Sequence, residues 1–320
     1  MSHSRHGAWA LAFLTLAFGV LTACAQEFPN KPIRIVTSGA GGGGDFAARL
    51  IAQGLLSRMG QQVVVDNRPS GVIPGQIVSQ ASPDGYTLLF AGSTLWIGPL
   101  MRAAPYDPVR DFAPVTMGIS TPNILVVPPS LPVKTVKEFI AMAKEKPGGL
   151  NYGSVGTGAS SHLSMELFKA MAEVNIVRVA YKSGGSAHID LVAGQVQMMM
   201  PTASAISPHV RSGRLRGLAV TSAQPSALAP GLPTIAASGL PGFEAVSPFG
   251  LFAPARTPAA IIRRLNEEAV AVLRTAEVRE RLFNNGVEAV GGTPAELAAA
   301  MQSERSRLGK VIKDAGIREE

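Results

Sequence analysis

Cysteine is nearly missing from this sequence. Cys24 is the single cysteine among 320 residues, and it lies close to the N-terminus. A disulfide within the chain is therefore excluded, even if the protein is exported to an oxidising compartment. A chain of this length has ample apolar residues for proper cores, so the fold must be held by packing, in one large domain or two of ordinary size.

Aromatic and charged residues are also scarce. Aromatics make up 6% of the sequence and charged residues 16%. The 29 Lys and Arg outnumber the 22 Asp and Glu, which gives a formal net charge of +7; such a surface attracts anions. Because the basic residues are dispersed and few aromatics could stack on bases, we do not expect nucleic acid as a partner.

Only one long apolar run is present, at residues 8–21. It is too short to span a bilayer, which takes about 20 residues, and small residues follow it. This pattern predicts a secretory signal peptide over residues 1–25 and export to the periplasm. Two processing routes stay open. Ala23-Cys24-Ala25 fits simple cleavage, which we favour, whereas the same segment also resembles a lipobox that would anchor a lipoprotein at Cys24.

Strand-like and helix-like segments alternate along the rest of the chain. IRIVT, QQVVVDN and YTLLFAG are rich in β-branched and aromatic residues, and DFAARLIAQGLLSRMG has apolar residues at helical spacing. This order predicts a parallel sheet covered by helices. The second half repeats the scheme, with VQMMMP as one of its expected strands.

Two extended, proline-bearing passages, PNILVVPPS and SPFGLFAPA, each lead into a capped helix. We interpret them as two strands that cross between two α/β lobes and form a hinge. Residues 26–122 and 250–320 are expected to form lobe 1, and residues 123–249 lobe 2. The ligand cleft should lie between the lobes.

The stretch TSGAGGGGDF contains Gly39-x-Gly41-x-x-Gly44, the spacing of a dinucleotide-binding loop. Asp66 even lies where a ribose-binding acid would be expected. However, Asp45 directly follows the last glycine and would place a carboxylate where a pyrophosphate lies, and an exported protein seldom meets a dinucleotide. Glycines before a helix also bind other anions through backbone N–H groups, so a carboxylate is the better ligand. Asp45 is then expected to be the N-cap of the helix.

A second small-residue loop, SVGTGASSH over residues 154–162, also lies between an expected strand and an expected helix. Two facing lobes that each offer such a loop could hold an acidic ligand from both sides. His162 either faces the ligand or makes a hydrogen bond at the helix start. Ser160 or Ser161 beside His162 does not indicate a hydrolase, because adjacent residues at a helix start do not point at each other and no G-x-S-x-G motif is present.

Many motifs, in the same order and spacing, resemble the Bug receptors, which are the extracytoplasmic binding proteins of tripartite tricarboxylate transporters (TctC) in Gram-negative bacteria. The resemblance covers essentially the whole chain after the signal peptide. The motifs that carry it include SGAGGGGDFAARL, VVVDNRP, SPDGYTLL, PYDPVRDFAPVT, SSHLSMELFKAMA, GRLRGLAVTSA and GLFAPARTP.

The resemblance implies a type II periplasmic-binding-protein fold, with two Rossmann-like lobes that close over a small ligand. It also implies that the two loops hold carboxylates through backbone amides, hydroxyls and waters, while other residues line the walls. The loop residues implied are Ser38, Gly39, Ala40, Gly41, Gly42, Gly43, Asp45, Gly156, Thr157, Gly158, Ser160, Ser161 and His162. The wall residues implied are Ser93, Thr94, residues 71–75, Pro201, Thr202 and Phe249.

The sequence departs from the family pattern at Pro201-Thr202, where relatives often carry Asp-Asn. Without that acid an amino acid should bind poorly, so we expect a di- or tricarboxylate, or an aromatic acid or amide. The resemblance implies membrane subunits of a transporter as partners, or alternatively a sensor kinase. We expect a monomer with no enzymatic activity and no cofactor, and the histidine spacing gives no support for a metal site.

Overall fold

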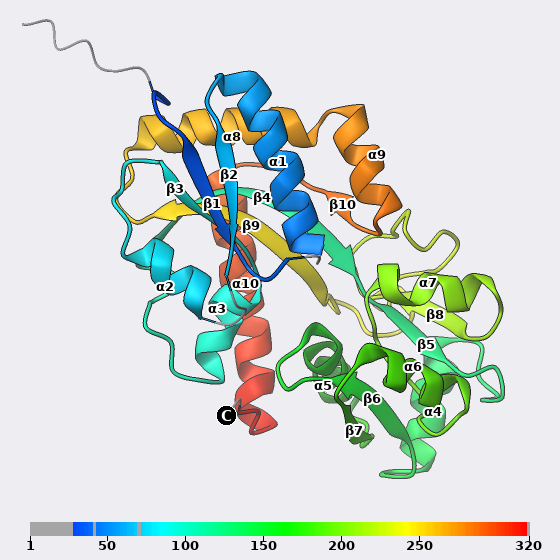
Figure 1. Ribbon diagram of the computed structural model, residues 1–320. Coiled ribbons are helices and arrows are strands. Elements are labelled where there is room, and N and C mark those ends of the chain that lie inside the picture. The colour runs from blue at the N-terminus through cyan, green and yellow to red at the C-terminus, as the bar shows by residue number, and fades with distance from the viewer. Residues whose placement is uncertain (1–27, 41–42, 69–71, 319–320) are drawn as a thin grey trace, which may run out of the picture.

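A computed structural model describes residues 28–40, 43–68 and 72–318 of the chain (Figure 1). The predicted signal peptide, with Cys24, lies outside these residues, as do Gly41, Gly42 and Gly71. Within the described ranges, no helix has both the length and the apolarity that crossing a membrane requires.

Lobe 1 is built on a six-stranded mixed sheet with the order β10-β4-β9-β3-β1-β2. The three expected strands of the first half are all present and pair in parallel, with β1 in the middle. β9 then pairs antiparallel with both β3 and β4. The strands are β1 (Ile33–Thr37), β2 (Val63–Asn67), β3 (Thr87–Gly92), β4 (Phe112–Pro122), β9 (Val246–Pro254) and β10 (Glu288–Ala289).

Helices cover both faces of this sheet, as Figure 1 shows. One core packs α1 and α8 against the strands, and it includes Ile35, Leu55 and Leu265, all fully buried. A second core lies on the opposite face, where α3 and α10 pack, and continues into lobe 2. The helices of lobe 1 are α1 (Gly43–Met59), α2 (Ile73–Ser79), α3 (Thr94–Ile97) with the 3₁₀ turn η1 (Gly98–Leu100), α8 (Ala259–Leu273), α9 (Ala276–Asn284) and α10 (Pro294–Asp314).

Lobe 2 contains one antiparallel strand pair, β5-β8, and one parallel pair, β6-β7. Its strands are β5 (Ile124–Val127), β6 (Asn151–Val155), β7 (Val177–Tyr181) and β8 (Arg216–Val220). Its helices are α4 (Val136–Glu145), α5 (Ser160–Ala172), α6 (Gly184–Val192) and α7 (Ala203–Arg211).

The prediction that VQMMMP forms a regular strand is wrong. Met198 and Met199 make only isolated bridges, to Tyr152 and Val126, which join the two strand pairs. The segment is buried as expected. It stays short because turns precede it and because Pro201, which has no N–H to donate, ends it.

The chain passes between the lobes twice, next to the β4-β9 pair. Pro122 at the end of β4 faces Val246 at the start of β9. Just beyond, the backbone N–H of Asn123 donates to Thr221 Oγ1 at 2.8 Å, and the Thr221 hydroxyl donates back to the Asn123 carbonyl at 3.1 Å. This gives the two-stranded connection expected from the sequence. The numbered domain boundaries stay a prediction, and β9 belongs to the six-stranded sheet.

Helix α10 reaches from lobe 1 toward lobe 2 (Figure 1). It begins with a capping box, in which the Thr293 hydroxyl accepts from the Glu296 N–H and the Glu296 carboxylate accepts from the Thr293 N–H. Its apolar face includes Leu297 and Met301, and farther along Leu308 and Ile312 extend the same core. Helix α10 thereby contributes side chains to the region between the lobes.

Candidate functional site

The first glycine loop follows β1 at the edge where β1 and β2 both end. Asn67, the last residue of β2, donates from Nδ2 to the Ser38 carbonyl at 3.0 Å and to Asp45 Oδ1 at 2.9 Å. Parallel strands end at the same sheet edge, which brings these residues together. The loop is thus held in place by the neighbouring strand.

Asp45 is not the N-cap of α1, so that expectation is wrong. The helix begins at Gly43, because glycine can adopt helical angles, and Asp45 therefore lies in the first turn. Its side chain is 8% exposed and forms an ion pair with Arg49 at 3.0 Å. A carboxylate in the first turn is favourable beside the positive helix end. Asp45 therefore positions the loop.

The second loop joins β6 to α5 and turns at two glycines with left-handed backbone, Gly156 (φ 61°) and Gly158 (φ 76°). The Gly158 N–H donates to His162 Nδ1 at 3.1 Å. Of the two roles left open for His162, the structure shows this hydrogen bond at the helix start. Burial, and then the charge of Arg178, lowers the pKa of His162 to about 4, so its ring is neutral near pH 7.

Arg178 on β7 was missed in the sequence, although it supports the second loop. Its Nε donates to Ser154 Oγ at 2.8 Å, its Nη1 to Thr157 Oγ1 at 3.4 Å and its Nη2 to the Gly156 carbonyl at 3.1 Å. One guanidinium group therefore fixes three positions of the loop and places a positive charge beside it. The basic residue between the two valines of VRVAYK is the sequence feature that could have indicated this role.

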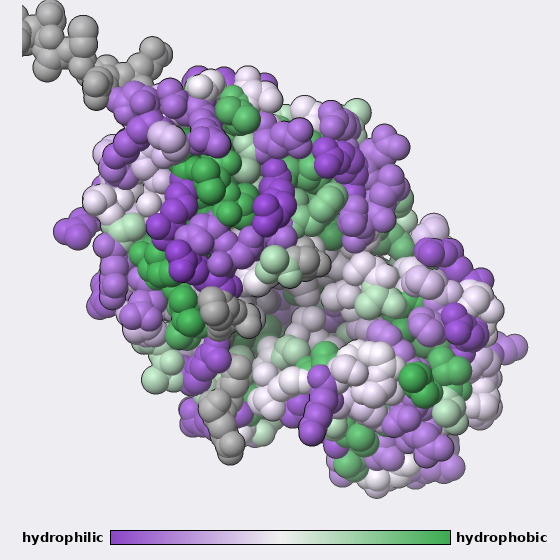
Figure 2. Space-filling model, in the orientation of Figure 1, coloured by the Kyte–Doolittle hydropathy of each residue, from purple (hydrophilic) through white to green (hydrophobic). Residues whose placement is uncertain are grey.

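Both loops line one cavity of about 440 Å³, which we call the outer chamber. It lies between the lobes, and Figure 2 shows a hollow between the two bodies. Arg102 is the single charged residue among its described lining, and it was not predicted. The lining residues are Ser38, Pro74, Gly75, Ala91, Gly92, Thr94, Leu95, Gly98, Met101, Arg102, Thr157, Gly158, Ala159 and Phe249.

A smaller cavity of about 170 Å³, the inner chamber, adjoins the outer chamber. The two share five lining residues, so they form one cleft. Glu304 of α10 is the single charged residue among the described lining of the inner chamber. The lining residues are Gly92, Ser93, Thr94, Ile97, Met101, Gly158, Ser160, Leu163, Ser164, Ala245, Val246, Ser247, Pro248, Phe249, Glu304 and Leu308.

Phe249 forms the wall that the two chambers share. Its ring stacks on Phe90, with 5.8 Å between the ring centroids. A Cβ atom at Gly44 would lie 2.5 Å from the Phe249 ring, and one at Gly92 would lie 3.0 Å from it. Glycine at these two positions therefore lets the start of α1 and the end of β3 close around the ring.

Glu304 is held by Trp96. The Trp96 indole donates from Nε1 to Glu304 Oε2 at 2.8 Å, and Trp96 is 1% exposed and packs against Phe252. Trp96 therefore packs within a core of lobe 1. Burial raises the pKa of Glu304 to about 7, although the Trp96 hydrogen bond and Arg307 act in the opposite direction. This carboxyl group thus changes charge near neutral pH.

The structure brings only some of the predicted site residues to the cleft. Those that line a chamber are Ser38, Pro74, Gly75, Ser93, Thr94, Thr157, Gly158, Ser160 and Phe249. Those that line neither are Gly39, Ala40, Gly43, Asp45, Gly156, Ser161, His162, Pro201 and Thr202. Gly41 and Gly42 lie outside the described residues.

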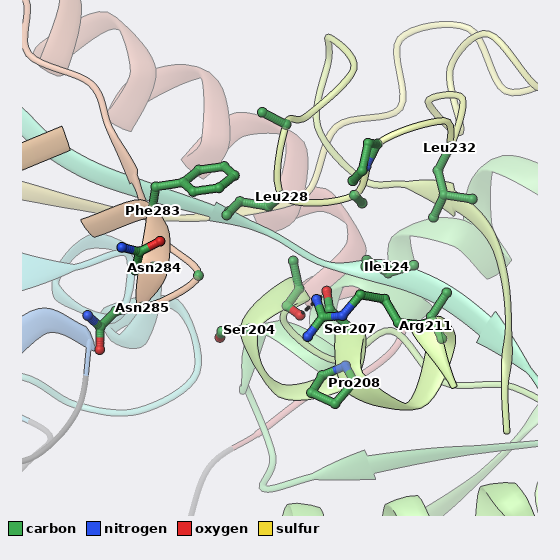
Figure 3. A pocket seen from close by; sticks show the side chains of 16 residues that line it. Ile124, Ser204, Ser207, Pro208, Arg211, Leu228, Leu232, Phe283, Asn284 and Asn285 are labelled. Carbon is green, nitrogen blue, oxygen red and sulfur yellow. Dashed lines mark hydrogen bonds between the residues drawn. The ribbon is translucent and has the colours of Figure 1, made fainter. Parts of the chain in front are cut away.

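A separate cavity of about 580 Å³ lies between α7, residues 227–232 and the end of α9 (Figure 3). Its lining is mostly apolar, with Arg211 as its single charged residue among those described. It contains none of the predicted ligand residues. We therefore place the functional site in the cleft, where both glycine loops converge, and not in this larger cavity.

No metal site is evident within the described ranges, which hold no group of three or more His, Cys, Asp or Glu side chains suited to a metal ion. His188 and His209 do approach each other, with ring centroids 5.8 Å apart. A zinc site needs three or four protein ligands, so this pair alone does not form one.

The family profile described as "Tripartite tricarboxylate transporter family receptor" matches residues 47–317. Among curated proteins, a UPF0065 protein from the tcbD-tcbE intergenic region of Pseudomonas sp. (strain P51) is 37% identical over 310 residues, covering 94% of this chain and 92% of the relative. Protein BugT of Bordetella pertussis is 34% identical over 310 residues, covering 95% of each chain.

Two solved structures are similar in fold and sequence. "R. palustris Rpa4515 with adipate" has a TM-score of 0.74 and 36% identity, covering 91% of this chain and 99% of that one. MatC from Rhodopseudomonas palustris, with bound malate, has a TM-score of 0.70 and 29% identity, covering 89% and 100%. The predicted type II periplasmic-binding-protein fold is thereby confirmed.

Proposed function

Since the chain belongs to the tripartite tricarboxylate transporter receptor family, we propose that it is a periplasmic receptor that captures a small carboxylate between its lobes. It then delivers the ligand to the membrane subunits of a transporter. A ligand that touches both lobes shifts the population toward the closed form, which is the form that a partner can distinguish.

One observation carries this proposal: Ser38 of the first loop and Thr157, Gly158 and Ala159 of the second loop line the same outer chamber, together with Arg102. The backbone N–H groups at the start of α5, beside Ala159, and the guanidinium group of Arg102 favour an anion, and the Ser38 and Thr157 hydroxyls can donate to it. A carboxylate matches these donors in size and charge. Arg178 behind the second loop increases the positive potential further.

The ligand class is supported by the two solved relatives, whose names record bound adipate and bound malate. We propose a di- or tricarboxylate, or an aromatic acid or amide. The weak binding of amino acids stays a prediction. Pro201 and Thr202, on which it depends, line neither chamber; Pro201 instead accepts a backbone hydrogen bond from Ile124 at 2.9 Å.

The geometry gives no support to a hydrolase at the second loop. His162 is buried, and its Nδ1 already accepts from the Gly158 N–H. Ser161 Oγ is buried and makes no hydrogen bond within the described part of the chain. A serine nucleophile needs a hydrogen bond to its base, which this arrangement does not provide.

A thermal-shift screen tests the proposal. Protein produced from Gln26 onward would be refolded to remove bound ligand and then mixed with C3 to C6 di- and tricarboxylates, aromatic acids and amides, and amino acids. A ligand at 100 times its Kd adds roughly 2.7 kcal/mol of stability, which gives a clear shift. We expect a carboxylate to stabilise the protein. Stabilisation by amino acids alone, or by none of these compounds, would contradict the proposal.

A further inference from the structure

The cleft carries opposite charges in its two chambers. Arg102 lines the outer chamber and Glu304 the inner chamber, and the remaining described lining residues of both are uncharged. An extended ligand that fills both chambers therefore meets a cation at one end and a carboxyl group at the other. The two ends of such a ligand should differ in chemistry.

Glu304 lines the inner chamber and is 8% exposed. It accepts a hydrogen bond from the neutral indole of Trp96. Two charged groups face it: Arg307 on its own helix and Glu244 from the segment before β9. These two pair with each other at 3.4 Å, so the charge of Arg307 is partly neutralised. Arg305 on the same helix donates to the Trp96 carbonyl.

We propose that Glu304 is the specificity-determining residue of the inner chamber. Its carboxylate accepts a hydrogen bond from the inner end of the ligand, so the receptor selects a carboxylate whose far end carries a hydroxyl or amide donor. This inference rests on the proposed function, because the ligand's own carboxylate must occupy the outer chamber. The other polar side chains that could meet that end are the hydroxyls of Ser93, Thr94, Ser160, Ser164 and Ser247.

A second ionised carboxylate at the inner end would stand beside Glu304. Two like charges in a buried site disfavour each other, so a dicarboxylate enters only when one proton is shared between them. Because burial raises the pKa of Glu304 to about 7, Glu304 carries this proton below pH 7 and has mostly lost it above pH 7. Dicarboxylate affinity should therefore fall as the pH rises, by about tenfold per pH unit above 7. A hydroxy acid or amide acid needs no such proton.

The test uses matched acids that differ only in the far end: adipate, adipamate, 6-hydroxyhexanoate and hexanoate, with the four-carbon set of succinate, succinamate, 4-hydroxybutyrate and butyrate. Kd is measured by titration calorimetry from pH 6 to 9. We expect the hydroxy and amide acids to bind at least tenfold more tightly than the plain acid. The affinity of the dicarboxylate should fall steeply above pH 7.

Glu304→Gln keeps an oxygen that can accept from Trp96 and removes the charge. We expect this variant to bind the dicarboxylate with an affinity that no longer depends on pH and that exceeds the wild-type value at pH 8. Glu277→Gln on α9 is the matched control, because Glu277 is 77% exposed and lines neither chamber. It should leave every Kd unchanged.

Two results separate this inference from the proposed function. If plain acids bind as tightly as hydroxy acids, or if dicarboxylate affinity is constant from pH 7 to 9, Glu304 does not set specificity, while the receptor function stands. If none of these acids binds at any pH, the inference fails; if no carboxylate of the thermal-shift screen binds either, the proposed function is contradicted with it.

Discussion

At the scale of single residues, the cleft depends on side chains that hold other groups in place. Arg178 holds the second loop from behind, Asn67 holds the first, and Trp96 orients Glu304. None of these three needs to touch a ligand. Each restricts the motion of a group that lines the cleft, and such restriction lowers the entropy lost on binding.

Arg178→Ala tests the support of the second loop. The variant loses three hydrogen bonds from one guanidinium group, so the loop should become more mobile and less positive. We expect adipate to bind roughly tenfold more weakly at pH 6, which matches the loss of one charge-assisted hydrogen bond. Calorimetry measures this change. Arg214→Ala removes an exposed arginine of the same lobe and should not change Kd; equal effects of both substitutions would argue against a local role.

The pH dependence of stability tests the environment of Glu304. Its pKa is raised from an ordinary 4.5 to about 7, so between these values the folded chain holds a proton that the unfolded chain has lost. Glu304 therefore destabilises the fold progressively as the pH rises from 4.5 to 7. His162 acts in the opposite sense between pH 4 and 6.5, because its folded pKa is lowered and stability increases as the pH rises.

Comparing Glu304→Gln with the wild type isolates the contribution of Glu304 to the pH dependence of stability. The free energy of unfolding of the variant, relative to that of the wild type, should increase by up to about 3 kcal/mol between pH 4.5 and 7. Urea denaturation at several pH values measures this difference. A difference that stays constant across the window would show that the carboxyl group is not buried in solution.

At the scale of elements, the lobes also touch outside the two crossing strands. Gly286, after α9, has φ 71°, and a Cβ atom there would lie 2.3 Å from Ser204 Cβ at the start of α7. This contact lies at the edge of the cavity in Figure 3. The approach of α7 to α9 therefore requires glycine at this position.

The methyl group added by Gly286→Ala should collide with Ser204 and push the two lobes apart. Gly213→Ala is the matched control, because Gly213 has the same φ of 71° and no atom within 4 Å of an added Cβ. Both variants pay the strain of a left-handed alanine, about 1–2 kcal/mol. We expect Gly286→Ala to lose further stability and to bind adipate more weakly, as urea denaturation and calorimetry would show. Identical behaviour of the two variants would exclude this effect.

The elements predicted from local patterns were mostly present. Their residue patterns depend on nearby residues alone, so the structure contains them as predicted. Examples are the strands IRIVT and YTLLFAG and the helix that includes DFAARL. The expected strand VQMMMP failed because burial, not ladder pairing, explains its apolar run. Asp45 was misplaced because the helix begins three residues earlier than expected, at Gly43 instead of Phe46.

At the scale of the whole molecule, the charged groups of the cleft could not be predicted from local patterns. Arg102 and Glu304 are about 200 residues apart in the sequence and meet the same cleft only because α10 returns to lie against α3. By contrast, the two glycine loops can be recognised from the sequence, because each lies between a strand and a helix. That order places such a loop at the edge of the sheet where the strands end. The sequence therefore predicted where the two loops lie in the fold, but not that Arg102 and Glu304 line the cleft beside them.

The most direct test of the account is a crystal structure of the chain from Gln26 onward with adipate, grown at pH 6. We predict one ligand carboxylate in the outer chamber, with its oxygens about 2.7–3.2 Å from backbone N–H groups of the two loops or from Arg102. The chain of the ligand should point toward Glu304. Adipate bound in the cavity beside Arg211, or on one lobe without contact to either loop, would contradict the account.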